Sequence, residues 1–266
     1  MNIEYSQFNN DNIQNYCYSY CMESNIKGHL HPITQIIREI YPVFQELGFQ
    51  IADGPELEDE FHNFDALNVP KDHPARDMQD TFWIKQNGKI KIENGTDTIK
   101  ADRMVLRTHT SSVQIRFMEN NKPPIRIVVP GKVYRNEATD STHEAQFYQL
   151  EALYVDKNVT LAHLKGVLET MFKRIFGEDV VIRFRPSFFP FTEPSVEVDM
   201  QWKGKWLEMG GAGLVHPNVF KSVGIDPNIY QGFAFGFGLD RVAMLKFGID
   251  DVRYNYTGDL RLINQF

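Results

Sequence analysis

The order of predicted helices and strands is the sequence feature that most limits the fold. Residues 32–47 carry apolar side chains at the i, i+3, i+4, i+7 spacing of an amphipathic helix, and residues 160–176 repeat the pattern. A final helix is predicted at 239–247. Strands are predicted on either side of a Pro130-Gly131 turn and beyond it, at 126–129, 132–135, 147–155, 180–186, 195–202 and 205–210. Because the strict strand–helix alternation of a dinucleotide-binding fold is absent, we expect an α+β domain: an antiparallel sheet of six or seven strands flanked by helices.

The composition and the hydrophobic periodicity of the sequence change near residue 31. Residues 1–30 are rich in Asn, Ser and Tyr without a steady period, which predicts a weakly ordered or partner-dependent arm. Residues 31–266 carry the predicted helices and strands and are expected to form a single domain. Within this domain, residues 53–80 are dense in Asp, Pro, His and Asn and are predicted to be a long loop, either functional or disordered.

The charge balance limits what this chain can bind alone. It carries 28 Lys and Arg against 35 Asp and Glu, which gives a net charge of −7. A protein that grips a nucleic-acid backbone usually has a basic face. If this chain acts on a nucleic acid, most contacts to the nucleic-acid backbone should therefore come from other chains or from a missing arm.

Several features predict a cytoplasmic protein without membrane association. No apolar run approaches the roughly 18 residues that a membrane helix needs. The polar, acidic N-terminus does not resemble a secretory signal. The only two cysteines, Cys17 and Cys21, make a poor zinc site because a second pair and a nearby His-x-x-x-His are absent, so we expect reduced thiols.

Three common catalytic motifs can be excluded. No Gly-x-x-x-x-Gly-Lys-Ser/Thr phosphate loop occurs, and the glycines at 210–213 and 232–238 do not fit Gly-x-Gly-x-x-Gly. His143-Glu144 begins like a zinc protease motif, but the second histidine would have to stand at position 147, which is Phe147.

Three other stretches resemble the signature motifs of class II aminoacyl-tRNA synthetases. These are the Gly48-Phe49 and Gly54-Pro55 pairs after the first helix, the residues 134–137 with 147–151 (YRNE and FYQLE), and the residues 232–241 (GFAFGFGLDR). The flanking sequence is similar to the α subunit of phenylalanyl-tRNA synthetase at 73–77, 106–111, 183–194 and 215–218. The resemblance covers 31–266 and implies a class II synthetase catalytic domain.

Arg135 and Arg241 are the residues for which we predict a catalytic role. Activation of an amino acid by ATP needs a cation at the α-phosphate, and Arg135 at a strand end can offer a planar fork there. The resemblance implies that Arg241 binds the terminal phosphate and that Glu137, His143 and Phe147 complete the ATP site. An ion pair between Arg135 and Glu137 at the surface, with Phe147 in the core, is the alternative.

A second group of residues is predicted to bind the amino acid. Strand alternation places Phe147, Gln149 and Glu151 on one face. The resemblance implies that Gln149 and Glu151 contact the substrate, and that the slot for its ring and the anchors for its polar end come from His109, Ser111, Phe189, Phe191, Ala234 and Gln79. Phe189 and Phe191 would make edge-to-face contacts with the substrate ring.

Two acidic residues carry further expectations. Glu193 is a candidate Mg²⁺ ligand by resemblance, with a structural carboxylate as the alternative. Asp240 stands where the family usually has glutamate, which puts its supporting bond to Arg241 or a neighbouring residue in question.

The resemblance implies the catalytic α subunit of phenylalanine–tRNA ligase, which uses ATP and Mg²⁺ to form phenylalanyl-adenylate and then charges tRNA(Phe). A β subunit in an α2β2 heterotetramer is the implied partner. Helix 32–47, whose apolar stripe suits self-complementary packing, is expected to form a subunit interface together with the strand that follows it. The alternative is a stand-alone paralogue that binds or adenylates an amino acid without charging tRNA.

Overall fold

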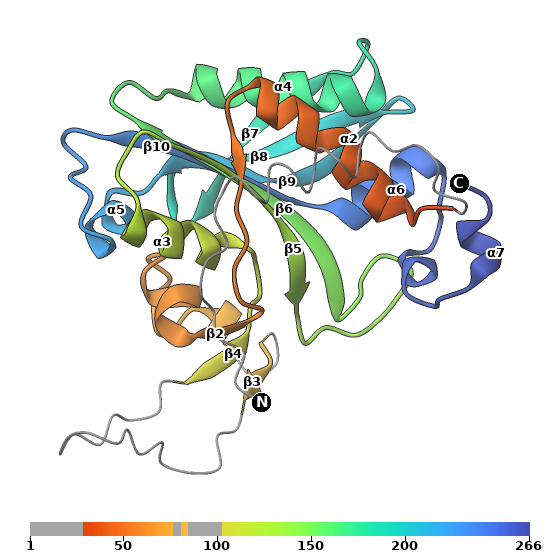
Figure 1. Cartoon of the computed structure of the whole chain (residues 1–266), viewed down its shortest axis with the longest axis horizontal. Coiled ribbons are helices and arrows are strands. Elements are labelled where there is room, and N and C mark those ends of the chain that lie inside the picture. The colour runs from red at the N-terminus through yellow and green to blue at the C-terminus, as the bar shows by residue number, and fades with distance from the viewer. Residues whose placement is uncertain (1–28, 77–80, 85–102) are drawn as a thin grey trace, which may run out of the picture.

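A computed structural model describes residues 29–76, 81–84 and 103–266 of this chain (Figure 1). Residues 1–28, Cys17 and Cys21 among them, and Gln79 lie outside the described residues. Within the described part, no helix has the length and apolar character needed to cross a membrane.

The centre of the molecule is a seven-stranded sheet with the order β1-β5-β6-β10-β9-β8-β7. All neighbouring strands are antiparallel except the short β1, which runs parallel to β5. The strands are β1 (Gln50–Ile51), β5 (Ile125–Tyr134), β6 (Gln146–Asp156), β7 (Ile182–Phe189), β8 (Thr192–Trp202), β9 (Lys205–Val215) and β10 (Gln231–Gly238). The predicted α+β class is confirmed, with a mixed sheet in place of a purely antiparallel one.

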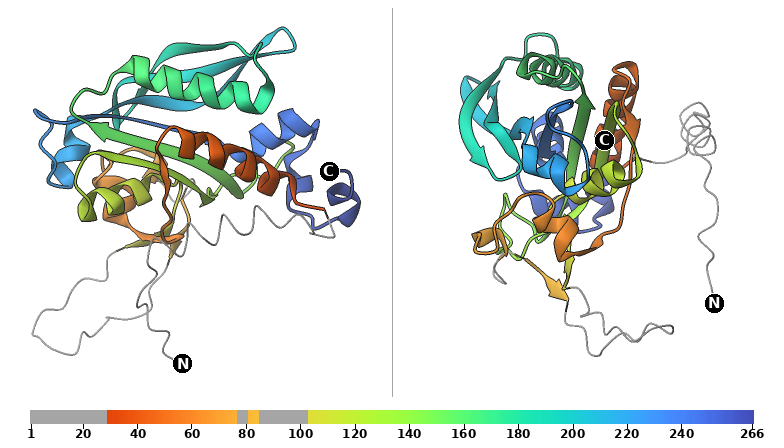
Figure 2. Two further views of the ribbon diagram at one scale, coloured as in Figure 1. Left: turned by 45° about the horizontal axis from the view of Figure 1, so that its top comes forward. Right: turned by 90° about the vertical axis from the view of Figure 1, so that its left-hand side faces the viewer.

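Three helices pack on one face of this sheet: α2 (Pro32–Glu46), α4 (Leu161–Phe176) and α6 (Leu239–Phe247). Figure 2 shows α2 and α4 side by side, and the two helices are in contact. Helix α2 begins at Pro32 because the His31 Nδ1 accepts a hydrogen bond from the Ile33 amide (3.2 Å), and Gly48 follows its end at a φ of +78°.

The apolar stripe of α2 lies in the core of its own chain. Ile36, Ile40 and Phe44 are fully buried, and α2 contacts both α4 and α6. The sheet and the neighbouring helices therefore cover the stripe, which is not free for self-complementary packing. A subunit interface formed by the rest of this helix and the strand that follows it stays a prediction.

A second core cluster covers part of the opposite face of the sheet. Strand alternation sends Ile127 and Val129 into this cluster, whereas Val128 points into the first. The covering elements are helix α3 (Ser111–Asn120), helix α5 (Pro217–Ser222) and the segment 61–69, which begins with the π-helix η1 (Phe61–Asp65).

The predicted loop 53–80 is more regular than expected. It contains strand β2 (Leu57–Asp59), η1 and the 3-10 helix η2 (Pro74–Arg76). Strand β2 pairs with β4 (Met104–Leu106), which also pairs with β3 (Trp83–Ile84), so a three-stranded sheet stands beside the main one.

The predicted Pro130-Gly131 turn is wrong, because β5 runs through it without a break. Pro130 pairs with Leu150, and Gly131 with Gln149, in register with the rest of β6. On the other side, β1 pairs only with Ile127 and Val128, so β5 is an edge strand at Pro130. An edge strand tolerates a proline because no ladder hydrogen bond is needed there.

The C-terminal residues return to the main sheet. The 3-10 helix η3 (Val252–Asn255) packs against α6, and helix α7 (Leu260–Ile263) follows it. The Val252 amide donates to the Ser141 carbonyl (2.9 Å), so this segment is fastened to the loop between β5 and β6.

Candidate active site

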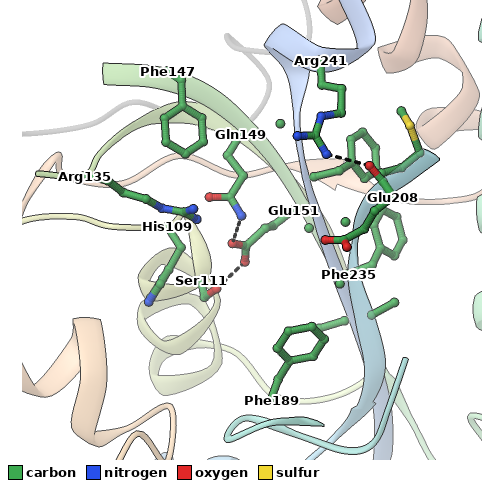
Figure 3. A pocket seen from close by; sticks show the side chains of 18 of the residues that line it. His109, Ser111, Arg135, Phe147, Gln149, Glu151, Phe189, Glu208, Phe235 and Arg241 are labelled. Carbon is green, nitrogen blue, oxygen red and sulfur yellow. Dashed lines mark hydrogen bonds between the residues drawn. The ribbon is translucent and has the colours of Figure 1, made fainter. Parts of the chain in front are cut away.

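A cavity of about 560 Å³ lies on the sheet where β6, β10 and β9 run side by side (Figure 3). This volume is in the range of small-molecule sites in proteins. Twelve of the fourteen predicted site residues line it: His109, Ser111, Arg135, Glu137, His143, Phe147, Gln149, Glu151, Phe189, Phe191, Ala234 and Arg241. Of the other two, Gln79 is not described and Glu193 lies outside the lining.

The floor of the cavity is formed by alternating residues of β6 and by glycines of the neighbouring strands. Phe147, Gln149 and Glu151 all line the cavity, as the strand alternation predicts. Gly236 on β10 pairs with Glu151, and a Cβ at Gly236 would lie 2.8 Å from the Glu151 Cγ. Glycine at this position therefore leaves room for the Glu151 side chain.

A buried hydrogen-bond network surrounds the Glu151 carboxylate. Its Oε2 accepts from the Ser111 hydroxyl (2.6 Å) and from the Gln114 Nε2 (2.7 Å), and its Oε1 accepts from the Gln149 Nε2 (2.9 Å). Burial raises the pKa of Glu151 to about 7, despite the donors that stabilise the carboxylate. A cation placed here would be a favourable partner for this carboxylate.

Two further polar side chains, Gln149 and His109, line this end of the cavity. The Gln149 Oε1 is buried and has no hydrogen-bond partner among the described residues, so it is an acceptor directed at a ligand or at water. Burial, together with the Arg135 charge, lowers the pKa of His109 to about 3, which keeps this imidazole neutral at physiological pH.

The two predicted catalytic arginines line the cavity from different elements (Figure 3). Arg135 directly follows β5, and its guanidinium carbon lies 5.0 Å from the centroid of the Phe147 ring. Its Nη1 is 3.9 Å from a carboxylate oxygen of Glu137, so the ion pair considered as an alternative exists, but it lies at the cavity. Arg241 in the first turn of α6 donates from Nη1 to the Glu208 carbonyl (2.7 Å).

The Asp240 carboxylate accepts its hydrogen bonds from residues other than Arg241. This carboxylate is 4% exposed and accepts from the Tyr148 amide (2.8 Å), the Tyr256 hydroxyl (2.7 Å) and the Asn255 Nδ2 (3.2 Å). Burial raises its pKa above the ordinary value. The shorter side chain is thus well satisfied, and it fixes the position of α6, which carries Arg241.

The apolar end of the cavity is walled by aromatic and aliphatic side chains. Phe189 and Phe191 stack parallel to each other, with ring centroids 5.9 Å apart and an interplanar angle of 6°. A Cβ at Gly211 would lie 2.8 Å from the Phe189 ring, so this glycine lets the ring lie against β9. The aliphatic lining at this end consists of Leu67, Val215, Val219 and Ala234.

The structure places Glu193 at the surface. Its side chain is 72% exposed and lies 3.3 Å from the His216 Nε2. Glu208 on β9, whose carbonyl accepts the hydrogen bond from Arg241, also has its carboxylate in the cavity lining, and the sequence motifs gave no role to it. Its position two residues before the glycines 210–211 is the one signal that could have drawn attention to it.

The lining fits a nucleoside triphosphate and a divalent cation. Two guanidinium groups offer planar forks for phosphate, and Phe147 offers a ring face. The half-exposed carboxylate of Glu208 is an oxygen donor of the kind that Mg²⁺ prefers, and Arg185 at 3.6 Å is its partner in an ion pair.

The fold, and a cavity with an apolar end at Phe189 and another end lined by Arg135 and Arg241, agree with a family comparison. The chain matches the family model described as tRNA synthetases class II core domain (F) over residues 16–266. Its structure also resembles the crystal structure of pyrrolysyl-tRNA synthetase from Desulfitobacterium hafniense, with a TM-score of 0.65 at 14% identity, covering 97% of this chain and 88% of that chain. This second likeness concerns the fold alone.

Curated relatives narrow the family further. The phenylalanine–tRNA ligase α subunit of Synechocystis sp. is 51% identical over 240 residues, which cover 90% of this chain and 68% of that protein. The α subunit of Rhodopirellula baltica is 52% identical over 243 residues, covering 90% and 69%. The chain therefore belongs to the class II tRNA synthetase core family, and its curated relatives there are phenylalanine–tRNA ligase α subunits.

Proposed function

We propose that this chain is the catalytic α subunit of a phenylalanine–tRNA ligase, which activates phenylalanine with ATP and transfers it to tRNA(Phe). The observation that carries this proposal is the two-ended cavity. One end joins a buried carboxylate, Glu151, to an apolar slot walled by Phe189 and Phe191, and the other end is lined by the guanidinium groups of Arg135 and Arg241.

The amino-acid end suits phenylalanine for two reasons. The α-ammonium group can approach the Glu151 carboxylate and the Gln149 Oε1, which has no partner among the described residues. The side chain enters the apolar slot, where phenyl rings favour edge-to-face or offset contact with another ring. Ala234 leaves space at the slot where a larger side chain would reduce it.

The nucleotide end suits activation of the carboxylate. A carboxylate oxygen of phenylalanine attacks the α-phosphorus, the bond to the bridging oxygen breaks, and pyrophosphate leaves with that electron pair. Arg135 stabilises the charge that develops at the α-phosphate, and Arg241 binds the terminal phosphate. Phe147 offers a stacking face for adenine, and Glu137 and His143 line the same end.

A divalent cation fits beside these groups. Mg²⁺ neutralises phosphate charge when it is bound, and the half-exposed Glu208 is a carboxylate of the cavity lining that would hold it. Glu193 remains a predicted ligand from the sequence resemblance, although it is exposed and lies outside the lining.

The partners of this chain follow from its relatives and its charge. We propose a β subunit as partner, in an α2β2 heterotetramer, because the curated relatives are named α subunits. With a net charge of −7, the chain should leave most of the tRNA grip to other chains or to a further segment. A cytoplasmic location belongs to the same proposal.

Amino-acid-dependent exchange of pyrophosphate into ATP tests this function. The chain is assayed with and without the β chain of its own organism, against each of the twenty amino acids. We expect exchange with phenylalanine in the complex and charging of tRNA(Phe) by the same complex. Exchange that depends on a different amino acid, or none in a folded complex, would refute the proposal.

A further inference from the structure

The apolar slot is assembled from three segments that are far apart in the sequence. Leu67 comes from the segment after η1, Phe189 and Phe191 flank the turn between β7 and β8, and Val219 comes from α5. Because a hydrogen bond has a preferred distance and angle, a side-chain hydrogen bond between these segments helps to set the shape of the slot.

Asn68 provides such a link. Its Nδ2 donates to the Pro190 carbonyl (2.7 Å), and its Oδ1 accepts from the Asn218 Nδ2 (3.0 Å). Pro190 is the residue between Phe189 and Phe191, and Asn218 lies next to Val219 on α5. One side-chain amide therefore joins all three segments.

The backbone of Asn68 directs its amide to this place. Its φ is +59°, a left-handed conformation that asparagine tolerates better than most residues with a Cβ. The preceding residue, Leu67, is 2% exposed and lines the cavity, so Asn68 fixes the end of the segment that carries this wall.

The segment itself is held by other bonds. The Ser222 hydroxyl donates to the Ala66 carbonyl (3.0 Å), and the Arg76 guanidinium donates to the Val69 carbonyl. Leu67 and Phe64 are buried in the second core cluster. Removal of the Asn68 amide should therefore leave the segment folded and disturb mainly the link to Pro190.

We infer that Asn68 is a positioning residue for the apolar slot. Its amide sets the distance between Leu67 on one side of the slot and the Phe189–Phe191 pair on the other, and so affects which substrate rings fit. This inference rests on the proposed function. It assigns Asn68 no contact with ATP or with the polar end of the amino acid.

The test is kinetic and uses the αβ complex with two variants of Asn68. Asn68→Gly keeps the left-handed backbone accessible and removes both side-chain bonds, whereas Asn68→Asp keeps the side-chain size but cannot donate to Pro190. Asn218→Ala removes only the second bond. Lys203→Gly is the matched control, because Lys203 also has a positive φ (+48°) but stands in the β8–β9 turn, away from the cavity lining.

We expect both Asn68 variants to raise the KM for phenylalanine about tenfold in pyrophosphate exchange, the size of effect that the loss of one or two hydrogen bonds gives, with the KM for ATP unchanged. The preference for phenylalanine over 4-methylphenylalanine should fall by a similar factor, because the ring end is less well confined. Asn218→Ala should act in the same direction but more weakly, and Lys203→Gly should match the wild type.

The outcomes distinguish a failure of the proposed function from a failure of the positioning role of Asn68. If the wild-type complex shows no phenylalanine-dependent exchange, the proposed function fails. If the wild type is active and the Asn68 variants keep its KM for phenylalanine and its ring preference, the positioning role is refuted. Equal increases in the KM for phenylalanine and for ATP would also refute it, because they indicate a general structural role.

Discussion

The phenolic hydroxyl of Tyr256 donates a 2.7 Å hydrogen bond to the Oδ1 of Asp240, the residue directly before Arg241. Asn255 donates to the same oxygen, and its carbonyl lies 2.9 Å from the Nε2 of His31, at the start of α2. The C-terminal segment thus connects the first helix to the residue that places Arg241.

Tyr256→Phe tests the role of this connection. The variant leaves a buried carboxylate with one donor fewer, which costs about 1–3 kcal/mol of the free energy of unfolding. We expect a lower melting temperature and an increase of about tenfold in the KM for ATP, with a smaller change in the KM for phenylalanine. Arg261→Ala, an exposed change on α7 that removes only a local ion pair with Asp259, is the control. Unchanged ATP kinetics in Tyr256→Phe would show that Arg241 does not depend on this bond.

Asp240→Glu tests whether the cage is built for the shorter side chain. The extra methylene must fit beside three donors in a site that is 4% exposed, and overpacking of this kind costs about 1–3 kcal/mol. We expect reduced thermal stability and no gain in the exchange rate. A variant that is both as stable and more active would mean that the aspartate limits the rate of this protein.

The pH dependence of phenylalanine binding tests the role of Glu151. Burial raises its pKa to about 7 from 4.5, so below pH 7 the free protein holds this group mainly protonated. Binding of the ammonium group needs the carboxylate, so the KM for phenylalanine should rise as the pH falls below 7, by up to about tenfold per pH unit. Glu151→Gln should have a high KM without this pH dependence. A wild-type KM that is flat between pH 5.5 and pH 8 would contradict the role.

The same pKa shift predicts a stability effect with a definite sign. Between pH 4.5 and pH 7 the folded protein binds more protons at Glu151 than the unfolded chain does. The free energy of unfolding should therefore fall as the pH rises through this window. Chemical denaturation of wild type and Glu151→Gln at several pH values measures it, and the variant should lack this contribution. Identical slopes for the two proteins would argue against the raised pKa.

Two glycine-to-alanine changes separate the loss of space in the cavity, which should affect substrate binding, from the loss of backbone freedom, which should affect stability. At Gly236 a Cβ would lie 2.8 Å from the Glu151 Cγ and 2.9 Å from the Gln149 Nε2, so Gly236→Ala should raise the KM for phenylalanine about tenfold or more. At Gly166 in α4 a Cβ meets no atom within 4 Å, so Gly166→Ala should stabilise the protein by about 0.5–1 kcal/mol without changing the kinetics. The reverse pattern would be incompatible with the described cavity.

Local sequence patterns located the long helices well, because each has one clear apolar stripe. Helix α4 begins one residue after the predicted start, and α6 matches its prediction. Helix α3 was missed because its buried side is mixed: Val113, Ile115 and Met118 pack in the second core cluster, whereas Ser111 and Gln114 are buried to hold Glu151 and interrupt the apolar stripe. Polar side chains that line a site remove the very period by which a helix is recognised.

The contents of the site were predictable only where strand alternation or the family resemblance applied. Alternation brought Phe147, Gln149 and Glu151 together correctly. The partners of Asp240 were not predictable, because Tyr148 is 92 residues away from it in the sequence and only the sheet topology makes them neighbours. The link between Asn68 and Pro190 spans 122 residues and escaped notice for the same reason.

The two arginines should act on one ligand. We expect Arg135→Gln and Arg241→Gln each to lower kcat/KM for ATP by about 10²–10³-fold, as the loss of one group that stabilises transition-state charge does. Arg126→Gln is the control, because Arg126 stacks on Tyr154 outside the cavity lining. The double variant should lose less than the product of the two single losses, since groups that act on one transition state are not additive. Fully independent losses would suggest separate sites.

A crystal structure of the αβ complex with a non-hydrolysable sulfamoyl analogue of phenylalanyl-adenylate tests the central claim most directly. We predict that the phenyl ring lies in the slot beside Phe189, Phe191 and Ala234, with the ammonium at Glu151, the sulfamoyl group at Arg135 and the adenine on Phe147. An analogue bound outside this cavity, or one that lies in it with its phenyl ring at Phe147 and its adenine at Phe189, would contradict the account.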